Sequence, residues 1–260
     1  MTTLLSATNV SRAFGGVQAL NACSLEVEKG SITGLIGPNG SGKTTLFNVM
    51  TGYVKPDAGT VTFDGRDITN ARPDDVFALG IGRTFQLTRI FAQITVLENM
   101  LVATQRSEGW LRGLTRSKSS PSEVEKAMEW LDFVGIARLA ELKAGALSYG
   151  QRKLLERAYV LVADPDVILL DEPAGGVNLS LINRIGEKIT ALNAQGKTFL
   201  IVEHNMEFVM NLCHSVTVMH QGCHLVSGAP AEVRANPLVL DAYLGGGDEE
   251  PEELLEAVDE

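Results

Sequence analysis

The sequence lacks a long apolar segment. No apolar run approaches the roughly 18 residues needed to cross a bilayer, and the most apolar stretch, residues 160–170, is interrupted by Asp164, Pro165 and Asp166. Residues 1–10 have no basic start followed by an apolar block, so no secretory signal is predicted. We therefore expect a soluble protein.

Cysteine is scarce. The three cysteines, Cys23, Cys213 and Cys223, form no even, regularly spaced framework, which favours a reducing cytoplasm over a disulfide scaffold. The composition is otherwise ordinary, because 45% of the 260 residues are hydrophobic and 21% are charged. Collagen, coiled coil and intrinsic disorder are excluded, and the length fits one large domain or two small ones.

An excess of basic residues is also missing. The net charge of −10 is mostly local, since residues 248–260 carry eight acidic groups and no basic one. Without those eight, 24 of the 32 acidic residues remain against 22 Lys and Arg, so the rest of the chain is nearly neutral. No basic face for nucleic acid is predicted. Residues 246–260 are expected to form an acidic, solvated C-terminal tail.

The order of apolar segments and turns predicts an α/β fold. Short strands are expected early in the chain, and two later continuous apolar runs are typical of strands buried in a parallel sheet. The early strands are residues 4–10, 24–27, 32–36 and 61–63, and the later ones are residues 167–170 and 198–202.

A helical block is expected between residues 87 and 162. Thr95 with Glu98, and Ser120 with Glu123, have the spacing of capping boxes, and Pro121 suits a first helical turn. Residues 108–120 between these helices are polar and rich in Gly and Ser. They are expected to form a solvated surface loop rather than a contact with a membrane or permease.

Residues 37–44, GPNGSGKT, fit the pattern G-x-x-x-x-G-K-[ST] completely. Glycine lets successive backbone N–H groups surround anionic oxygens, and the start of a helix, expected from about Thr44, adds positive charge. Lys43 is expected to reach the β- and γ-phosphates, and the Thr44 hydroxyl to bind Mg²⁺. The predicted phosphate-binding residues are Gly37, Pro38, Asn39, Gly40, Ser41, Gly42, Lys43, Thr44 and Thr45.

Two carboxylates follow the apolar strand 167–170. Asp171 is expected to hold Mg²⁺ through water, and Glu172 to orient or deprotonate the attacking water. A strand that ends in Asp-Glu is a weak signal alone. Together with the phosphate loop it indicates a site for nucleotide hydrolysis with Mg²⁺.

The chain resembles the ATP-binding-cassette (ABC) ATPases. The residues that carry this resemblance are the phosphate loop, a glutamine loop ending at Gln86, the signature-like sequence LSYGQ at residues 147–151, the Asp171–Glu172 pair and His204. They occur in the family's order, and the resemblance covers about residues 4–245. It implies a P-loop ABC ATPase core with an N-terminal antiparallel β portion in residues 1–86 and 163–245, and an inserted helical subdomain in residues 87–162.

The resemblance implies roles for further residues. Gln86 and His204 would sense the γ-phosphate, with Gln86 also near the metal, and Phe14 would stack on adenine. From the residues alone, Phe14 could equally be a core side chain and His204 a satisfied core histidine. Ser148 is expected to cap a helix, and in the head-to-tail dimer of this family the signature residues Ser148, Gly150 and Gln151 would meet the nucleotide of the partner.

The resemblance also implies partners and a location. Residues 80–86, 95–99, 203–206 and 242–245 look like the branch that powers branched-chain amino-acid import (the LivG type). We expect a second, non-identical ABC ATPase subunit, two integral membrane permeases and an external substrate-binding protein, at the cytoplasmic face of the membrane. The cargo would be branched-chain or other neutral amino acids. A urea or amide importer, a lipopolysaccharide-type exporter and a soluble ABC ATPase stay open as alternatives.

The sequence departs from the common family pattern at three positions. Tyr149 replaces a glycine of the signature and Asn178 replaces an aspartate of the D-loop, and both variants are familiar in the branched-chain branch. Tyr159 replaces an arginine that is common in the signature helix.

Three histidines and two cysteines crowd into residues 213–224 and look like zinc ligands. Residues 215–219, however, are expected to form a strand, with Gln221 and Gly222 as the turn into the next strand. Successive strand residues point to opposite faces, so a hairpin is favoured over a metal site.

Overall fold

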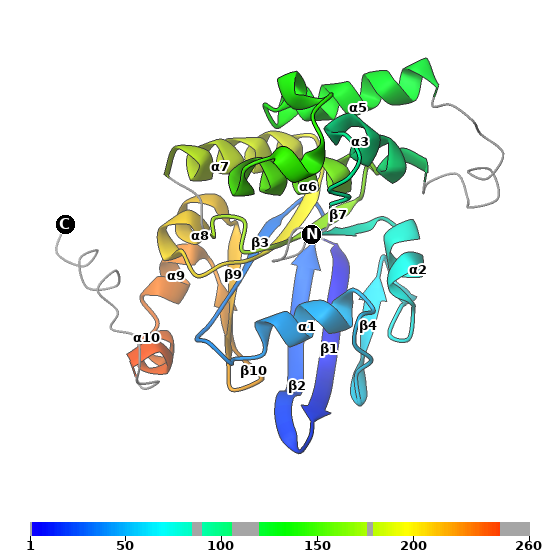
Figure 1. Ribbon diagram of the computed structural model, residues 1–260. Coiled ribbons are helices and arrows are strands. Elements are labelled where there is room, and N and C mark those ends of the chain that lie inside the picture. The colour runs from blue at the N-terminus through cyan, green and yellow to red at the C-terminus, as the bar shows by residue number, and fades with distance from the viewer. Residues whose placement is uncertain (1, 85–89, 106–119, 176–178, 245–260) are drawn as a thin grey trace.

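The computed structural model describes residues 2–84, 90–105, 120–175 and 179–244. Two sheets and three groups of helices make up this part of the chain (Figure 1). None of the helices within these ranges has the length and apolar character that a membrane span requires.

The first sheet is antiparallel, with the strand order β2-β1-β4-β5. Its strands are β1 (Thr3–Phe14), β2 (Val17–Glu28), β4 (Ala58–Phe63) and β5 (Arg66–Asp67). The early strands predicted for this sheet are confirmed, but all three are longer than expected. β1 continues to Phe14 because Asp57 accepts hydrogen bonds from the Ala13 amide at 2.8 Å and from Arg12 at 2.6 Å.

The second sheet has the order β10-β9-β3-β8-β7-β6 and is parallel except for the hairpin of β9 and β10. Its strands are β3 (Ile32–Ile36), β6 (Ile81–Arg83), β7 (Val167–Asp171), β8 (Thr198–Val202), β9 (Ser215–His220) and β10 (Cys223–Gly228). Every residue of β3, β7 and β8 is buried, as the continuous apolar runs predicted. The expected hairpin at residues 215–228 is also confirmed.

Helices cover both faces of the parallel sheet. Helix α1 (Lys43–Met50) covers one face of the parallel sheet and also packs against the antiparallel sheet. The fully buried Phe47 of α1 lies in the core that α1 shares with both sheets. The opposite face is covered by α7 (Leu179–Ala194), α8 (Met206–Leu212) and α9 (Pro230–Arg234), with α10 (Pro237–Leu244) beyond them. Both faces are therefore sealed, which leaves the ends of the strands as the place for polar side chains.

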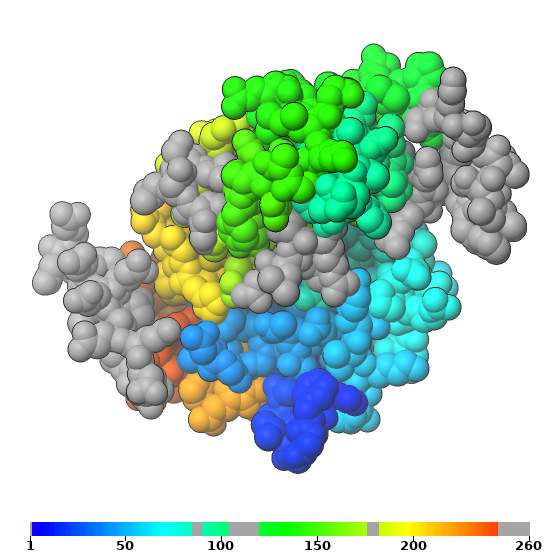
Figure 2. Space-filling view, in the orientation of Figure 1, coloured from blue at the N-terminus to red at the C-terminus, as the bar shows by residue number. Residues whose placement is uncertain are grey.

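Three further helices have a core of their own and lie above the sheets (Figure 1). They are α3 (Val96–Gln105), α5 (Pro121–Phe133) and α6 (Tyr149–Leu161), with short 3₁₀ turns at Ala137–Leu139 and Ala144–Ala146. Figure 2 shows α5 and α6 in green at the opposite end of the molecule from the blue β1–β2 hairpin. The limits of the helical subdomain, residues 87–162, and of the surrounding core stay a prediction.

Both predicted capping boxes are present. The Thr95 amide donates to Glu98 at 2.7 Å while Thr95 Oγ1 accepts from the Glu98 amide at 3.1 Å. Ser120 and Glu123 make the same reciprocal pair at the start of α5, where Pro121 occupies the first turn. A smaller helix, α2 (Pro73–Ala78), leads into β6. The loop predicted at residues 108–120 lies outside the described residues except for Ser120, and the tail 246–260 lies wholly outside them.

Candidate active site

The loop at residues 37–44 joins β3 to α1, and its backbone requires glycine. The φ angles of Gly37, Gly40 and Gly42 are 149°, 76° and 99°. A Cβ on Gly37 would stand 2.2 Å from the carbonyl oxygen of Met219, and one on Gly42 would stand 2.5 Å from that of Ala19. The loop therefore turns closely against two neighbouring strands. Any residue other than glycine at positions 37 and 42 would clash there.

Helix α1 begins directly after this loop. Its N-cap residue is Gly42, and no side chain caps the first turn. The N–H groups of the first turn have no partner within the helix, and the helix dipole adds positive potential there. Apart from Pro38, which has no N–H, the predicted residues Gly37 to Thr45 therefore form a cradle of backbone donors suited to an anion.

Lys43 places a cation within this cradle. It is 6% exposed, and its Nζ donates to the carbonyl oxygens of Gly37 at 2.6 Å and Pro38 at 2.9 Å. Burial lowers the pKa of Lys43 to about 8, and the carboxylates of Glu172 and Asp171 oppose that shift. The three groups are thus close enough to interact, although Lys43 lies about 130 residues before the carboxylates.

Asp171 is the last residue of β7 and is 6% exposed. Arg83 Nη2 lies 3.3 Å from Asp171 Oδ2, and both side chains are buried. Burial raises the pKa of the Asp171 carboxyl, while Arg83 lowers it. Arg83 also donates to Asn48 Oδ1 at 2.8 Å and Thr51 Oγ1 at 2.9 Å, which ties β6 and β7 to the end of α1.

Glu172 follows Asp171 and has a φ angle of 48°, a left-handed conformation uncommon for a residue with a side chain. Its amide donates to the Val202 carbonyl at 2.9 Å, which holds it at the end of β8. Glu172 Oε1 lies 2.8 Å from His204 Nε2. The structure therefore joins two of the predicted catalytic residues, and the 47% exposure of the His204 side chain rules out a core histidine.

A buried carboxylate that the sequence analysis did not single out supports this pair. Glu203 Oε2 accepts from the His204 amide at 3.0 Å, and Oε1 accepts from the Ala174 amide. Arg157 Nη2 donates to the Pro173 carbonyl at 2.5 Å. Glu203 and Arg157 therefore fix the backbone that follows Glu172 and the backbone amide of His204. In the sequence, Glu203 follows the apolar run 198–202, and Arg157 follows Glu156 in a helix that carries several other charged residues, so neither stands out.

Ser148 caps α6 as predicted. Its Oγ accepts from the Gln151 amide at 3.3 Å, and the Ser148 amide donates to Gln151 Oε1 at 2.9 Å. Ser148 and Tyr149 are exposed, and Gly150 is half-buried. The signature residues thus form a second helix N-terminus at the surface. Among the described residues, these side-chain hydrogen bonds of Ser148 stay within its own helix.

Phe14 ends β1 and is 45% exposed, so the alternative of a core side chain is wrong. The guanidinium carbon of Arg12 lies 4.7 Å from the centre of its ring. An exposed ring with a cation against one face can stack on a planar group. Gln86 and the D-loop residue Asn178 lie outside the described residues, so their predicted roles stay predictions.

Two of the histidines that looked like zinc ligands have other partners. His214 Nδ1 accepts from the Ile32 amide at 3.1 Å, and His224 Nε2 lies 2.8 Å from Ser227 Oγ. Cys213 is buried, and burial raises the pKa of its thiol to about 12. These contacts explain the residues as parts of the sheet.

Comparison with known proteins gives matches along nearly the whole chain. Residues 20–175 match the family model described as ABC transporter, and residues 224–249 match one described as branched-chain amino acid ATP-binding cassette transporter. The high-affinity branched-chain amino acid transport ATP-binding protein LivG of Salmonella typhimurium is 39% identical over 249 residues, which cover 93% of this chain and 98% of that protein.

A probable branched-chain amino acid transport ATP-binding protein LivG of Archaeoglobus fulgidus is 40% identical over 255 residues, covering 96% of this chain and 98% of that protein. Among solved structures, the ADP conformation of an ATP-binding cassette of an ABC transporter superposes with a TM-score of 0.83. It is 38% identical and covers 94% of this chain and all of that one.

Proposed function

Because the chain belongs to the ABC transporter family, in which it is an ATP-hydrolysing subunit, we propose that it powers the import of branched-chain or other neutral amino acids. The observation that carries the choice of cargo is the match of residues 224–249 to a branched-chain amino acid cassette model. The printed names of relatives that align over almost their full length agree with it. These matches favour this cargo over urea, amides or lipopolysaccharide.

ATP would bind with its phosphates in the cradle of residues 37–45. The uncapped N–H groups of α1 and the buried ammonium of Lys43 suit a polyanion, since both place positive charge at the phosphate loop. Phe14, exposed beside Arg12, would stack on the adenine ring.

Magnesium fits the oxygen donors at the end of β7. The Thr44 hydroxyl, the Asp171 carboxylate and the side chain of Gln86 would hold it, since hard divalent cations prefer oxygen ligands. Bound there, Mg²⁺ would neutralise charge on the phosphate oxygens. Arg83 supports metal binding by Asp171, because it pairs with the Asp171 carboxylate while it is itself held by Asn48 of α1.

Glu172 would accept a proton from the attacking water or orient it. Its carboxylate is 24% exposed, so water can reach it, and His204 fixes its position from 2.8 Å. His204 would meet the γ-phosphate through the same exposed ring. Glu203 and Arg157 would hold Glu172 and His204 in position through hydrogen bonds to the neighbouring backbone.

A second ABC ATPase subunit, a non-identical homologue, would complete the site. The exposed N-terminus of α6 with Ser148, Gly150 and Gln151 supports this, because a second helix N-terminus offers donors to the phosphate held by a partner. ATP bound between two subunits would draw them together, and hydrolysis would release them.

Two membrane permeases would dock beside the helical part, and an external binding protein would deliver the cargo to them. A cavity of about 270 Å³ supports the docking site, since it lies between the core and the helices α2 and α6. Its rim includes the exposed Tyr53 and Phe91 together with Tyr159, and aromatic side chains are common anchors of protein interfaces. The protein would thus act at the cytoplasmic face of the membrane as a peripheral subunit.

Purification from gently solubilised native membranes tests the proposal. We expect two multi-span permeases and a second cassette to co-purify with the tagged chain. Vesicles that contain the recovered complex and its binding protein should take up labelled leucine with ATP, but not urea. Recovery of soluble partners alone, such as ribosomal proteins, would overturn the transport function, and ATP-driven uptake of urea instead would overturn the cargo.

A further inference from the structure

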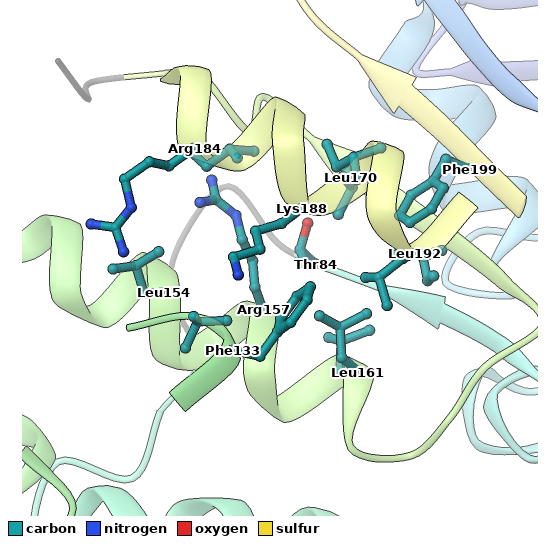
Figure 3. A pocket seen from close by; sticks show the side chains of 15 residues that line it. Thr84, Phe133, Leu154, Arg157, Leu161, Leu170, Arg184, Lys188, Leu192 and Phe199 are labelled. Atoms are coloured by element: carbon teal, nitrogen blue, oxygen red, sulfur yellow. The ribbon is translucent and has the colours of Figure 1, made fainter. Parts of the chain in front are cut away.

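Two features of the molecule are not used by the proposed steps of ATP binding and hydrolysis. One is a cavity of about 50 Å³ between α6 and α7, which Figure 3 shows. Aliphatic side chains and phenylalanine make up most of its lining, so this space belongs to the core. The other is an ion pair of Arg12 and Asp57 at the end of β1, beside the exposed ring of Phe14.

Asp57 binds the end of β1 through both oxygens of its carboxylate. Oδ2 accepts a hydrogen bond from the Ala13 amide at 2.8 Å, and Oδ1 accepts one from Arg12 Nη1 at 2.6 Å. The Asp57 amide in turn donates to the Ser11 carbonyl at 2.8 Å. A single residue, directly before β4, therefore holds three successive residues of β1 just before Phe14.

The Arg12 guanidinium lies over one face of the Phe14 ring. Its Cζ is 4.7 Å from the ring centre, within the range of a cation–π contact. In the part of the chain that the structure describes, Asp57 is the one hydrogen-bond partner of this guanidinium. The cation thus occupies one face of the ring, which leaves the other face for a ligand.

The ion pair keeps both of its charges at neutral pH. Hydrogen bonds from the Ala13 amide and from Arg12 lower the pKa of the Asp57 carboxyl below its ordinary value, so the carboxylate is ionised. The guanidinium of Arg12 stays protonated. Because Asp57 already holds this guanidinium, less side-chain freedom is lost when a ligand stacks on the ring.

A cation on one face changes how an aromatic ring stacks. The faces of the ring carry negative partial charge, and Arg12 draws this charge toward itself. The opposite face of Phe14 is therefore less negative. A purine has a larger face and is richer in π electrons than a pyrimidine, so it should stack more strongly on this face.

We propose that Arg12 and Asp57 are positioning residues for the nucleotide base. Asp57 fixes Arg12, Arg12 fixes one face of the Phe14 ring, and the other face stacks on a purine. This inference rests on the proposed role of Phe14 in adenine binding, and it makes the strength of stacking depend on two residues that do not touch the base. None of the bonds of Arg12 and Asp57 described above involves residues 37–45, so phosphate binding should not depend on the pair.

Calorimetric titration of the full-length chain with ADP and with pyrophosphate tests this, because both ligands carry a diphosphate and only ADP carries a base. The readout is the nucleoside ratio, defined as the affinity for ADP divided by the affinity for pyrophosphate. Arg12→Gln and Asp57→Asn should each lower this ratio by about twofold to fivefold, without a change in pyrophosphate affinity. Arg12→Lys keeps a cation and should retain most of the ratio. The parent protein should bind ADP at least about threefold more tightly than CDP, and Arg12→Gln should reduce this preference.

Two further variants serve as references. Arg66→Gln is the matched control, since Arg66 is an exposed arginine on β5 of the same sheet, and it should leave the nucleoside ratio unchanged. Phe14→Leu removes the ring and should lower the ratio by about tenfold or more. Adding Arg12→Gln to Phe14→Leu should lower the ratio no further, because the cation then has no ring to fix.

The nucleoside ratio also decides against the proposal if it fails. A ratio that Arg12→Gln and Asp57→Asn leave unchanged, while Phe14→Leu lowers it, would exclude the ion pair from base binding. Equal losses of ADP and pyrophosphate affinity would show a general effect on the fold in place of positioning. A further fall when Arg12→Gln is added to Phe14→Leu would show that Arg12 acts without the ring. An unchanged ratio in Phe14→Leu would contradict the proposed role of Phe14 itself, and this inference with it, so the two failures are distinguishable.

Discussion

Glu172 Oε1 and His204 Nε2 lie 2.8 Å apart although 32 residues separate them in the chain. They meet because β7 and β8 are adjacent parallel strands, so that the residues after each strand reach the same edge of the sheet. The Glu172 amide strengthens this arrangement by donating to Val202 at the end of β8. The geometry of this pair is thus a direct consequence of strand order.

Glu172→Gln should retain ATP binding and lose hydrolysis. The amide keeps the size of the side chain but cannot accept a proton from water, so we expect turnover to fall by at least about 100-fold. Single-turnover measurements with labelled ATP, together with a size measurement for a trapped closed dimer, check this. Rapid turnover by the variant would remove Glu172 from its proposed role.

Lys43→Ala should lose nucleotide affinity. Its ammonium lies within the cradle of residues 37–45, so its removal takes away a charge-assisted bond to phosphate, and we expect ATP to bind at least about 30-fold more weakly. Titration with a non-hydrolysable ATP analogue measures the effect. Lys55→Ala, on an exposed lysine, is the control, and equal affinity in the two variants would refute the role of Lys43.

Lys43 should also make nucleotide-free stability depend on pH. Its pKa is lowered from 10.5 to about 8 on folding, so the unfolded chain binds more protons between these two values. The cost of burying the ammonium is therefore full below pH 8 and is relieved as the pH rises toward 10.5. Lys43→Met should unfold at higher urea than the parent at pH 7, and this advantage should shrink by pH 10. A constant difference would contradict the buried charge.

Arg83→Met should strongly destabilise the fold. It leaves the buried Asp171 carboxylate without its ionic partner and removes the bonds to Asn48 and Thr51, for which we expect a loss of about 3–5 kcal/mol in the free energy of unfolding. Urea denaturation measures it. Adding Asp171→Asn should recover part of the loss, and simple additivity of the two changes would show that the pair is not coupled.

Phe91→Ser should weaken the association with the permeases. Phe91 is 53% exposed beside the 270 Å³ cavity, so its ring is free to insert into a partner, and we expect at least about tenfold less permease to co-purify. Leu238→Ser, a change at a similarly exposed side chain on α10, should have no effect. Equal recovery of permease with both variants would exclude this docking site.

The parts that the sequence predicted depend on short-range patterns. A few consecutive residues determine each of these patterns, namely the phosphate loop, the apolar strands and the three capped helix starts. The extension of β1 to Phe14 was missed because it depends on Asp57, which is 44 residues from Ala13. The three-residue strand β6 is too short to show a period.

The supporting residues of the site were missed for a related reason. Arg83 meets Asp171 across 88 residues, and Glu203 meets Ala174 across 29. A single charged residue in an apolar segment does not reveal which distant group it faces. Sequence patterns therefore locate the groups proposed to act on ATP, whereas the residues that hold these groups in place emerge only from the folded chain.

The cap at the start of α6 also determines whether that surface favours an anion or a cation. Ser148 Oγ and Gln151 Oε1 both accept backbone hydrogens from within the cap. Each of these oxygens keeps a second lone pair, and the Ser148 hydroxyl and the Gln151 amide group also carry hydrogens that they can donate to a ligand. The free N–H groups of the first turn and the helix dipole add to these donors, so this helix start favours an anion over a cation. Replacing Gln151 by glutamate would keep the cap and weaken that preference, because the carboxylate adds a negative charge beside the free N–H groups.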